Sequence, residues 1–391
     1  MPSIPRRTFL HQLGAGGLGA FGLGAAGCAS APRGGSQIPL YIGTYTRGRS
    51  RGIYLGRFDG ATGRISVDAV VEGIENPSFL ALSPAGTHLY AVSEVAEFAG
   101  SGGGGVVAYA IGPGTGLREI NRQPSHGAAP CYVSVDATGR HLMVANYTGG
   151  NAAVLPIRAD GSLGPASEVV QHSGSGPNTR RQEGPHAHFI RTDPANRFAF
   201  VVDLGIDRVV GYRFDATTGT LGAAANAGVA ARPGAGPRHL DFHPDGRRAY
   251  VINELDSTLT ALAYDPASGS MQATGTVSTL PSGYSGTNSC ADVHVAPSGR
   301  FVYGSNRGHD SIAVFAIDAA GGAPTPVQHQ PTLGRTPRNF AIDPTGRFLI
   351  AANQDSDSLV VFAIDPSSGR LSPIGEPVDV PVPVCVRLGN A

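Results

Sequence analysis

A motif of thirteen residues recurs six times along the chain without gaps. Most copies place a Pro-x-Gly turn between two apolar runs, a pattern typical of a β-hairpin. The copies are residues 82–94, 135–147, 192–204, 242–254, 295–307 and 342–354, and their turn residues lie 47 to 57 positions apart. This period indicates a repeat architecture, so the region that carries it is interpreted as one domain.

Each hairpin is followed by a second pair of short apolar runs, such as residues 311–318 and 359–365. Four short strands per unit predict a propeller blade, whereas two stacked β-sandwiches would not repeat one turn motif six times. A seventh, partial unit starts at residues 41–45 and 53–59, and residues 383–387 supply its missing strand. The sequence therefore predicts an all-β, seven-bladed β-propeller over residues 37–391, closed by N- and C-terminal strands in one blade.

Residues 1–36 read as a twin-arginine export signal and linker. Arg6-Arg7 precedes a weakly apolar run, residues 13–27, that is too short to span a bilayer. Ala25-Ala-Gly-Cys28 resembles a lipoprotein processing site, so a lipid on Cys28 would be the only contact with a membrane. Cleavage nearby without lipid, and a cleaved or disordered N-terminus of a cytoplasmic protein, are the alternatives. We expect a periplasmic or otherwise exported protein.

Charge composition excludes several function classes. The 29 acidic residues balance 29 arginines, and the chain has no lysine. A neutral chain lacks the basic face that nucleic-acid binding requires. Without lysine, neither Schiff-base chemistry nor P-loop phosphate binding is available. We expect a monomer that acts on a small molecule, with no nucleic-acid partner.

The repeat register predicts where polar groups gather. In a propeller, the start of each innermost strand and the end of the next strand lie on one face of the disc. The residues eight positions before and eight positions after the turn residue form two polar columns at these places. His188, Arg238, Glu254, Arg307 and Arg338 belong to the columns and come from neighbouring blades. Charged groups crowded at a concave site are costly unless paired or used, which favours a functional site over a solvated rim. His239 and His294 lie off the columns and are expected to pack or cap.

A long connection, residues 173–185, leads into the strand that carries His188. Long loops in compact repeats are often functional. We expect Arg181, Glu183 and His186 to lie over the end of the central channel at which the two polar columns gather. His186 and His188 would share one face of a strand, but no third ligand is apparent. We therefore expect no metal centre and no cofactor.

The chain resembles the propeller-type 6-phosphogluconolactonase family, whose fold also serves fungal carboxymuconate cyclases. The resemblance covers roughly residues 40–388 and is carried by the segments 181–188, 236–239, 253–254, 305–310 and 337–339. It implies a catalytic set of His188, Arg238, Glu254 and Arg307. Arg181, Glu183, His186, Arg338 and Asn339 are the expected substrate-binding residues.

The expected reaction is hydrolysis of a sugar lactone, either 6-phosphogluconolactone or an unphosphorylated aldonolactone, to the aldonic acid. Arginines would stabilise the oxyanion, and either Glu254 or His188 would take the proton from water. No Gly-x-Ser-x-Gly motif stands at a predicted strand-to-helix turn, which favours direct attack by water. The export signal argues for an unphosphorylated substrate. A muconate-type cycloisomerase and a non-catalytic periplasmic binding propeller remain alternatives.

Overall fold

The computed structural model describes residues 37–390, with the exception of residues 99, 101 and 115. The predicted export signal and the lipid site at Cys28 lie outside these described residues. No helix among the described residues is long and apolar enough to cross a membrane.

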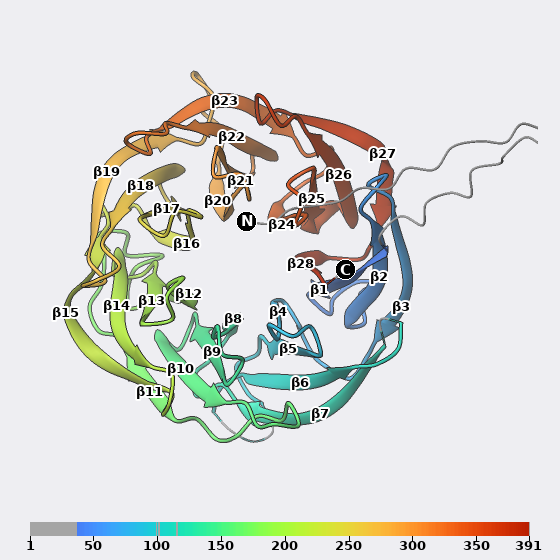
Figure 1. The fold of residues 1–391 in the computed structure, drawn as a ribbon, viewed down its shortest axis with the longest axis vertical. Coiled ribbons are helices and arrows are strands. Elements are labelled where there is room, and N and C mark those ends of the chain that lie inside the picture. The colour runs from blue at the N-terminus through green and yellow to red at the C-terminus, as the bar shows by residue number, and fades with distance from the viewer. Residues whose placement is uncertain (1–36, 99, 101, 115, 391) are drawn as a thin grey trace, which may run out of the picture. The chain divides into compact units, whose positions relative to one another are not determined.

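Seven four-stranded antiparallel sheets surround a central channel, which confirms the predicted all-β propeller (Figure 1). From the axis outward, four blades contain β28 (Pro383–Leu388), β1 (Gln37–Thr44), β2 (Ile53–Asp59) and β3 (Ile65–Val71); β4 (Leu80–Leu82), β5 (His88–Ser93), β6 (Gly105–Ile111) and β7 (Leu117–Pro124); β8 (Pro130–Val135), β9 (His141–Asn146), β10 (Asn151–Pro156) and β11 (Glu168–Gln171); and β12 (Ala187–Thr192), β13 (Phe198–Asp203), β14 (Arg208–Asp215) and β15 (Thr220–Ala230).

The other three blades contain β16 (Pro237–Phe242), β17 (Arg248–Asn253), β18 (Thr258–Tyr264) and β19 (Met271–Ser278); β20 (Ser289–Val295), β21 (Phe301–Arg307), β22 (Ser311–Ile317) and β23 (Pro324–Pro331); and β24 (Pro337–Ile342), β25 (Phe348–Asn353), β26 (Ser358–Ile364) and β27 (Leu371–Asp379). One 3₁₀ turn, Gln354–Ser356, follows β25.

The hairpin turn explains the residue that repeats at its centre. Gly86, Gly139, Gly246 and their equivalents have φ between 65° and 72°, and Asn196 has φ 56°. Glycine adopts this left-handed conformation at no steric cost, and asparagine tolerates it better than most residues. The six copies therefore turn in the same way, which keeps the blades in register.

The ring closes through the first and last strands of the fold. β28 pairs antiparallel with β1, with Tyr41 opposite Arg387 and Ile42 opposite Val386. This arrangement was predicted from the sequence, and it leaves no open sheet edge at the junction of the two ends.

The core lies between the blades. β5, β9, β13 and β25 are almost fully buried, whereas outermost strands such as β19 are mostly exposed. At three neighbouring innermost strands, the rings of Phe79, Tyr132 and Phe189 pack in a row, with centroids 4.1 and 4.5 Å apart from one ring to the next.

Candidate active site

The innermost strands carry β-bulges that aim polar side chains at the channel. The pairing of β8 with β9 skips Cys131, that of β12 with β13 skips His188, and that of β16 with β17 skips Arg238. Arg338 is skipped in the same way in β24. A bulged residue has no partner across the ladder, so its side chain is free to turn away from the sheet face. These four residues belong to the polar column that lies eight positions before the turn residue.

The column after the turn comes from the ends of second strands. Glu94 follows β5, Tyr147 follows β9, Glu254 follows β17, and Arg307 ends β21. The two columns meet at one end of the channel around a cavity of about 200 Å³. Its lining residues are Glu94, Cys131, Tyr147, Arg181, His188, Glu254, Arg307 and Arg338. Seven of these eight belong to the columns, and Arg181 belongs to the long loop.

Gln182 fixes the loop that delivers Arg181. Its side-chain amide donates to the Leu204 carbonyl at 2.9 Å and accepts from the Asn178 amide at 3.1 Å. Arg181 then reaches across the cavity to Glu254 and to the Tyr147 hydroxyl, at 2.6 and 3.2 Å. The loop therefore contributes a cation to the cavity as part of a fixed structure.

Glu254 is held by three guanidinium groups. Its Oε1 lies 2.6 Å from Arg181, and its Oε2 lies 2.9 Å from Arg238 Nε and 2.8 Å from Arg307. The contact with Arg238 is an ion pair without hydrogen-bond geometry, because Arg238 Nε has no hydrogen-bond partner among the described atoms. Burial alone would raise the pKa of Glu254, but the three cations together hold it far below its usual value. Glu254 is thus a permanent anion that keeps the arginines together.

Arg338 completes a positive site. It has no hydrogen bond or ion pair with any described residue, and its guanidinium lies over the Tyr45 ring at 5.3 Å. Burial and two nearby guanidiniums lower the pKa of Arg238 to about 10, so it is still charged at neutral pH. The site thus holds four guanidinium groups and only two carboxyl groups, those of Glu94 and Glu254, so its net charge is at least +2. This charge favours an anion or a developing oxyanion.

His188 and Cys131 lie together but do not form a reactive thiolate. The Cys131 sulfur is 3.6 Å from His188 Nδ1, and both side chains are buried. Burial raises the pKa of the Cys131 thiol, whereas burial, Arg238 and His239 place the pKa of His188 well below its usual value. At neutral pH the pair is a thiol and a neutral imidazole, so a thiolate nucleophile is disfavoured.

Glu94 is a second carboxyl group in the cavity, and sequence reasoning did not select it. Its oxygens accept from the Tyr45 hydroxyl at 3.1 and 3.0 Å, and one of them also accepts from the Ser78 hydroxyl. Burial is the main reason why the pKa of Glu94 is raised, although Arg338 and the hydroxyl groups oppose it. Ser78 and Glu94 belong to the two polar columns, so the repeat register could have identified both as candidate site residues. Tyr45 lies in the partial blade, which has no copy of the hairpin motif.

Behind the cavity, a buried network supports Arg238. His239 Nδ1 lies 2.7 Å from Asp292, and its Nε2 lies 3.3 Å from Arg238. Burial lowers the pKa of His239 to about 4, so the ring is neutral and links an ionised carboxylate to the arginine. His294 binds the other oxygen of Asp292 at 3.0 Å. Both histidines were expected to pack or cap, and His239 instead lies directly against a site residue.

Three of the expected substrate-binding residues do not line the cavity. Asn339 is buried, donates to Asp292 and accepts from the Val386 amide at 2.7 Å, so it ties β24 to β28. His186 stacks on the Tyr147 ring at 4.5 Å and lies 3.1 Å from Glu183, whose side chain is 60% exposed. Within the described part of the chain, no group of three or more His, Cys, Asp or Glu side chains is arranged to hold a metal ion.

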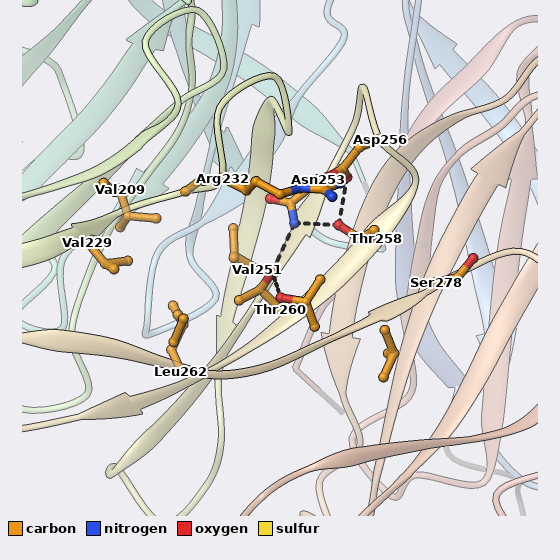
Figure 2. Close-up of a pocket in the computed structure, with 15 residues that line it drawn as sticks. Val209, Val229, Arg232, Val251, Asn253, Asp256, Thr258, Thr260, Leu262 and Ser278 are labelled. Carbon is orange, nitrogen blue, oxygen red and sulfur yellow. Dashed lines mark hydrogen bonds and ion pairs between the residues drawn. The ribbon is translucent and has the colours of Figure 1, made fainter.

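A larger pocket of about 380 Å³ lies between two blades, away from the channel (Figure 2). Its only ionisable lining residues, Arg232 and Asp256, pair with each other at 2.6 Å. Asn253 donates to Thr258 and Thr260, as the dashed lines show. The walls of this pocket are mostly apolar and its one charged pair is neutralised, so the smaller, charged cavity is the better candidate for chemistry.

The profile of the family described as "Lactonase, 7-bladed beta-propeller" matches residues 39–388. A 6-phosphogluconolactonase of Bacillus subtilis (strain 168) is 40% identical over 349 residues, which are 89% of this chain and 97% of that protein.

Solved structures of similar sequence have the same fold. A putative 6-phosphogluconolactonase from Bacteroides fragilis superposes with a TM-score of 0.84 at 34% identity, covering 91% of this chain and 98% of that one. The periplasmic gluconolactonase of Pseudomonas aeruginosa superposes with a TM-score of 0.84 at 36% identity, covering 91% and 99%.

Proposed function

The chain belongs to the family of seven-bladed β-propeller lactonases, and on that basis we propose that it hydrolyses a sugar lactone to the open-chain aldonic acid. The observation that carries this proposal is the cluster of three guanidiniums on Glu254, beside a cavity that also holds Arg338 and His188. Attack of water on a lactone carbonyl places negative charge on the carbonyl oxygen, and fixed cations stabilise that charge where it develops.

Each residue of the expected catalytic set has a role in this proposal. Arg307 lines the cavity, is held by Glu254 and by the Cys290 carbonyl at 2.8 Å, and faces the developing oxyanion. Arg238 lies beneath it and supplies charge without direct exposure. Neutral His188 contacts the lactone by a hydrogen bond at the carbonyl or the ring oxygen. Glu254 holds the arginines and is a poor proton acceptor, because its lone pairs already face cations.

The positive cavity also recognises an anionic or polyhydroxylated substrate. Arg338 is free to form charge-assisted hydrogen bonds with a phosphate, with a product carboxylate or with sugar hydroxyls. We retain both 6-phosphogluconolactone and an unphosphorylated aldonolactone as substrates for the test. The similarity to a periplasmic gluconolactonase favours the unphosphorylated one.

Export through the twin-arginine route is proposed together with that substrate. It is supported by Arg6-Arg7 in the sequence and by the periplasmic location in the name of the Pseudomonas relative. Cell fractionation of the wild type and of a variant with both arginines changed to lysine tests it. Retention of the variant in the cytoplasm is expected, and equal export of both proteins would contradict the route.

Acid release in a pH-stat tests the enzymatic proposal. The protein is incubated with glucono-δ-lactone and with 6-phosphogluconolactone, with and without chelator, and the spontaneous rate is subtracted. We expect release well above that rate, with the aldonate as the product seen by NMR. If neither lactone is opened faster than in buffer, or if the product is an isomer formed without consumption of water, hydrolysis is the wrong assignment.

A further inference from the structure

The cavity contains two carboxyl groups in opposite environments, Glu94 and Glu254. Where two acids share one site, the one without an ion-pair partner is the one better able to exchange protons. We propose that Glu94, and not Glu254, is the catalytic carboxyl group that takes the proton from the attacking water and returns it to the ring oxygen. This inference rests on the proposed lactone hydrolysis.

Geometry excludes Glu254 from that role. Both of its oxygens lie within 2.9 Å of a guanidinium nitrogen, and its side chain is only 5% exposed. A proton on either oxygen would replace an ion pair and leave several buried cations without a counter-charge. Proton transfer to Glu254 would therefore dismantle the group that stabilises the oxyanion.

Glu94 has the opposite surroundings. Tyr45 and Ser78 hold its oxygens through hydroxyl groups, and no guanidinium lies within ion-pair distance of it among the described residues. A carboxylate has about four lone-pair positions, so these contacts leave room for a water molecule. Burial raises the pKa of Glu94 above that of an ordinary glutamate, which makes it a stronger base than Glu254.

The position of Glu94 also suits an attacking water. A space of about 10 Å³ adjoins the charged cavity and shares four of its lining residues, and its volume is close to the smallest that holds one water. Glu94, His188 and Arg338 border both this space and the charged cavity. A water there would donate to Glu94 and accept from Arg338, which aligns one lone pair with a lactone in the cavity.

The proposed step balances with one proton. Water oxygen forms a bond to the lactone carbonyl carbon while Glu94 accepts a water proton, and the oxyanion faces the guanidiniums. The intermediate then collapses, the bond between carbonyl carbon and ring oxygen breaks, and Glu94 returns its proton to that oxygen. The carboxylate is regenerated, and the new carboxylic acid loses its proton to solvent at neutral pH.

The test compares Glu94→Gln with Glu97→Gln, a neighbouring exposed glutamate outside the cavity. Glutamine keeps the shape of Glu94 and one oxygen for the Tyr45 and Ser78 hydroxyls, so the variant should fold. General acid–base catalysis contributes ~10²–10⁴-fold, so kcat should fall by ~10² or more in Glu94→Gln and stay unchanged in Glu97→Gln.

The Ser78→Ala variant distinguishes a catalytic Glu94 from a merely structural one, because only a catalytic Glu94 would make the pH profile of kcat/KM shift. The Ser78 hydroxyl stabilises the ionised form of Glu94, so its removal should raise the pKa of Glu94. The acid limb of the kcat/KM profile reports the ionisation of the base and should therefore move to higher pH. The other groups that face Glu94, and stay unchanged in this variant, are Tyr45, Cys131, His188, Arg238 and Arg338.

The outcomes separate the two proposals. A wild type that opens no lactone refutes the proposed function. An active wild type with a Glu94→Gln variant of equal kcat, or with an acid limb that Ser78→Ala leaves in place, refutes the role of Glu94. If the Glu94 variant does not fold, the Ser78→Ala profile decides alone.

Discussion

Replacing Glu254 by glutamine removes the one negative charge that three guanidiniums share. The Arg238 and Arg307 side chains are 2% and 13% exposed, so these are buried ion pairs, whereas Arg181 is 40% exposed. Breaking a buried pair by removing one partner costs about 3–5 kcal/mol, and a half-exposed pair adds at most about 1 kcal/mol. We therefore expect the free energy of unfolding to fall by ~3–5 kcal/mol at pH 7, a large share of the stability of a typical domain.

The pH dependence of this loss has a definite sign. The pKa of Glu254 is lower in the folded protein than in the unfolded chain, so its stabilisation is fully present above the unfolded value of about 4.3. It declines as pH falls toward the folded value. The gap between wild type and variant should thus be constant from pH 8 to pH 5 and should narrow on further acidification.

Urea denaturation followed by circular dichroism at pH 7.5, 5 and 3.5 measures this gap. Glu376→Gln, at an exposed position of β27, is the matched control and should unfold with the wild type. A Glu254→Gln variant within 1 kcal/mol of the wild type at pH 7.5, or a gap that widens in acid, would show that the guanidinium cluster does not depend on this carboxylate.

Three further changes test other parts of the structure. Ending the chain at Val380 removes β28, which buries Val384 and Val386, and each buried valine contributes about 1.5–3 kcal/mol to stability. Near-ultraviolet circular dichroism should therefore show loss of tertiary packing. A native spectrum would contradict the closure of the ring by β28 and β1. Arg338→Gln should raise KM by about 10-fold with little change in melting temperature, because Arg338 has no ion-pair partner among the described residues; an unchanged KM would remove it from the site. Cys131→Ser should keep kcat within a few-fold in the same assay, since the neutral thiol is no nucleophile; complete inactivation would reopen covalent catalysis.

The repeat made most of the fold predictable. Gly86 and its equivalents mark a backbone conformation that few residues adopt, so the hairpins could be aligned without a structure. The partner of the first strand was also predictable, because the partial unit at residues 41–59 lacked a strand that residues 383–387 resemble. Both are local patterns repeated at a fixed period, which sequence reasoning detects well.

The site was predictable as a set of positions but not as a set of roles. Register brought His188, Glu254 and Arg307 to one cavity, yet it gave no means of separating Glu94 from Glu254. Their difference depends on which oxygens face guanidiniums, and that is a matter of rotamers and distances. The network of His239 and Asp292 was missed for a similar reason, because its members lie just outside the columns.

The bulges in the innermost strands separate scaffold from specificity. Cys131, His188, Arg238 and Arg338 each lack a cross-strand partner, so exchanging their side chains breaks no pairing between strands. Four of the blades thus each place one side chain at the channel without using it for strand pairing. Substitutions at these bulged positions can therefore alter which molecule the cavity accepts, while the hairpins that hold the propeller together keep their pairing.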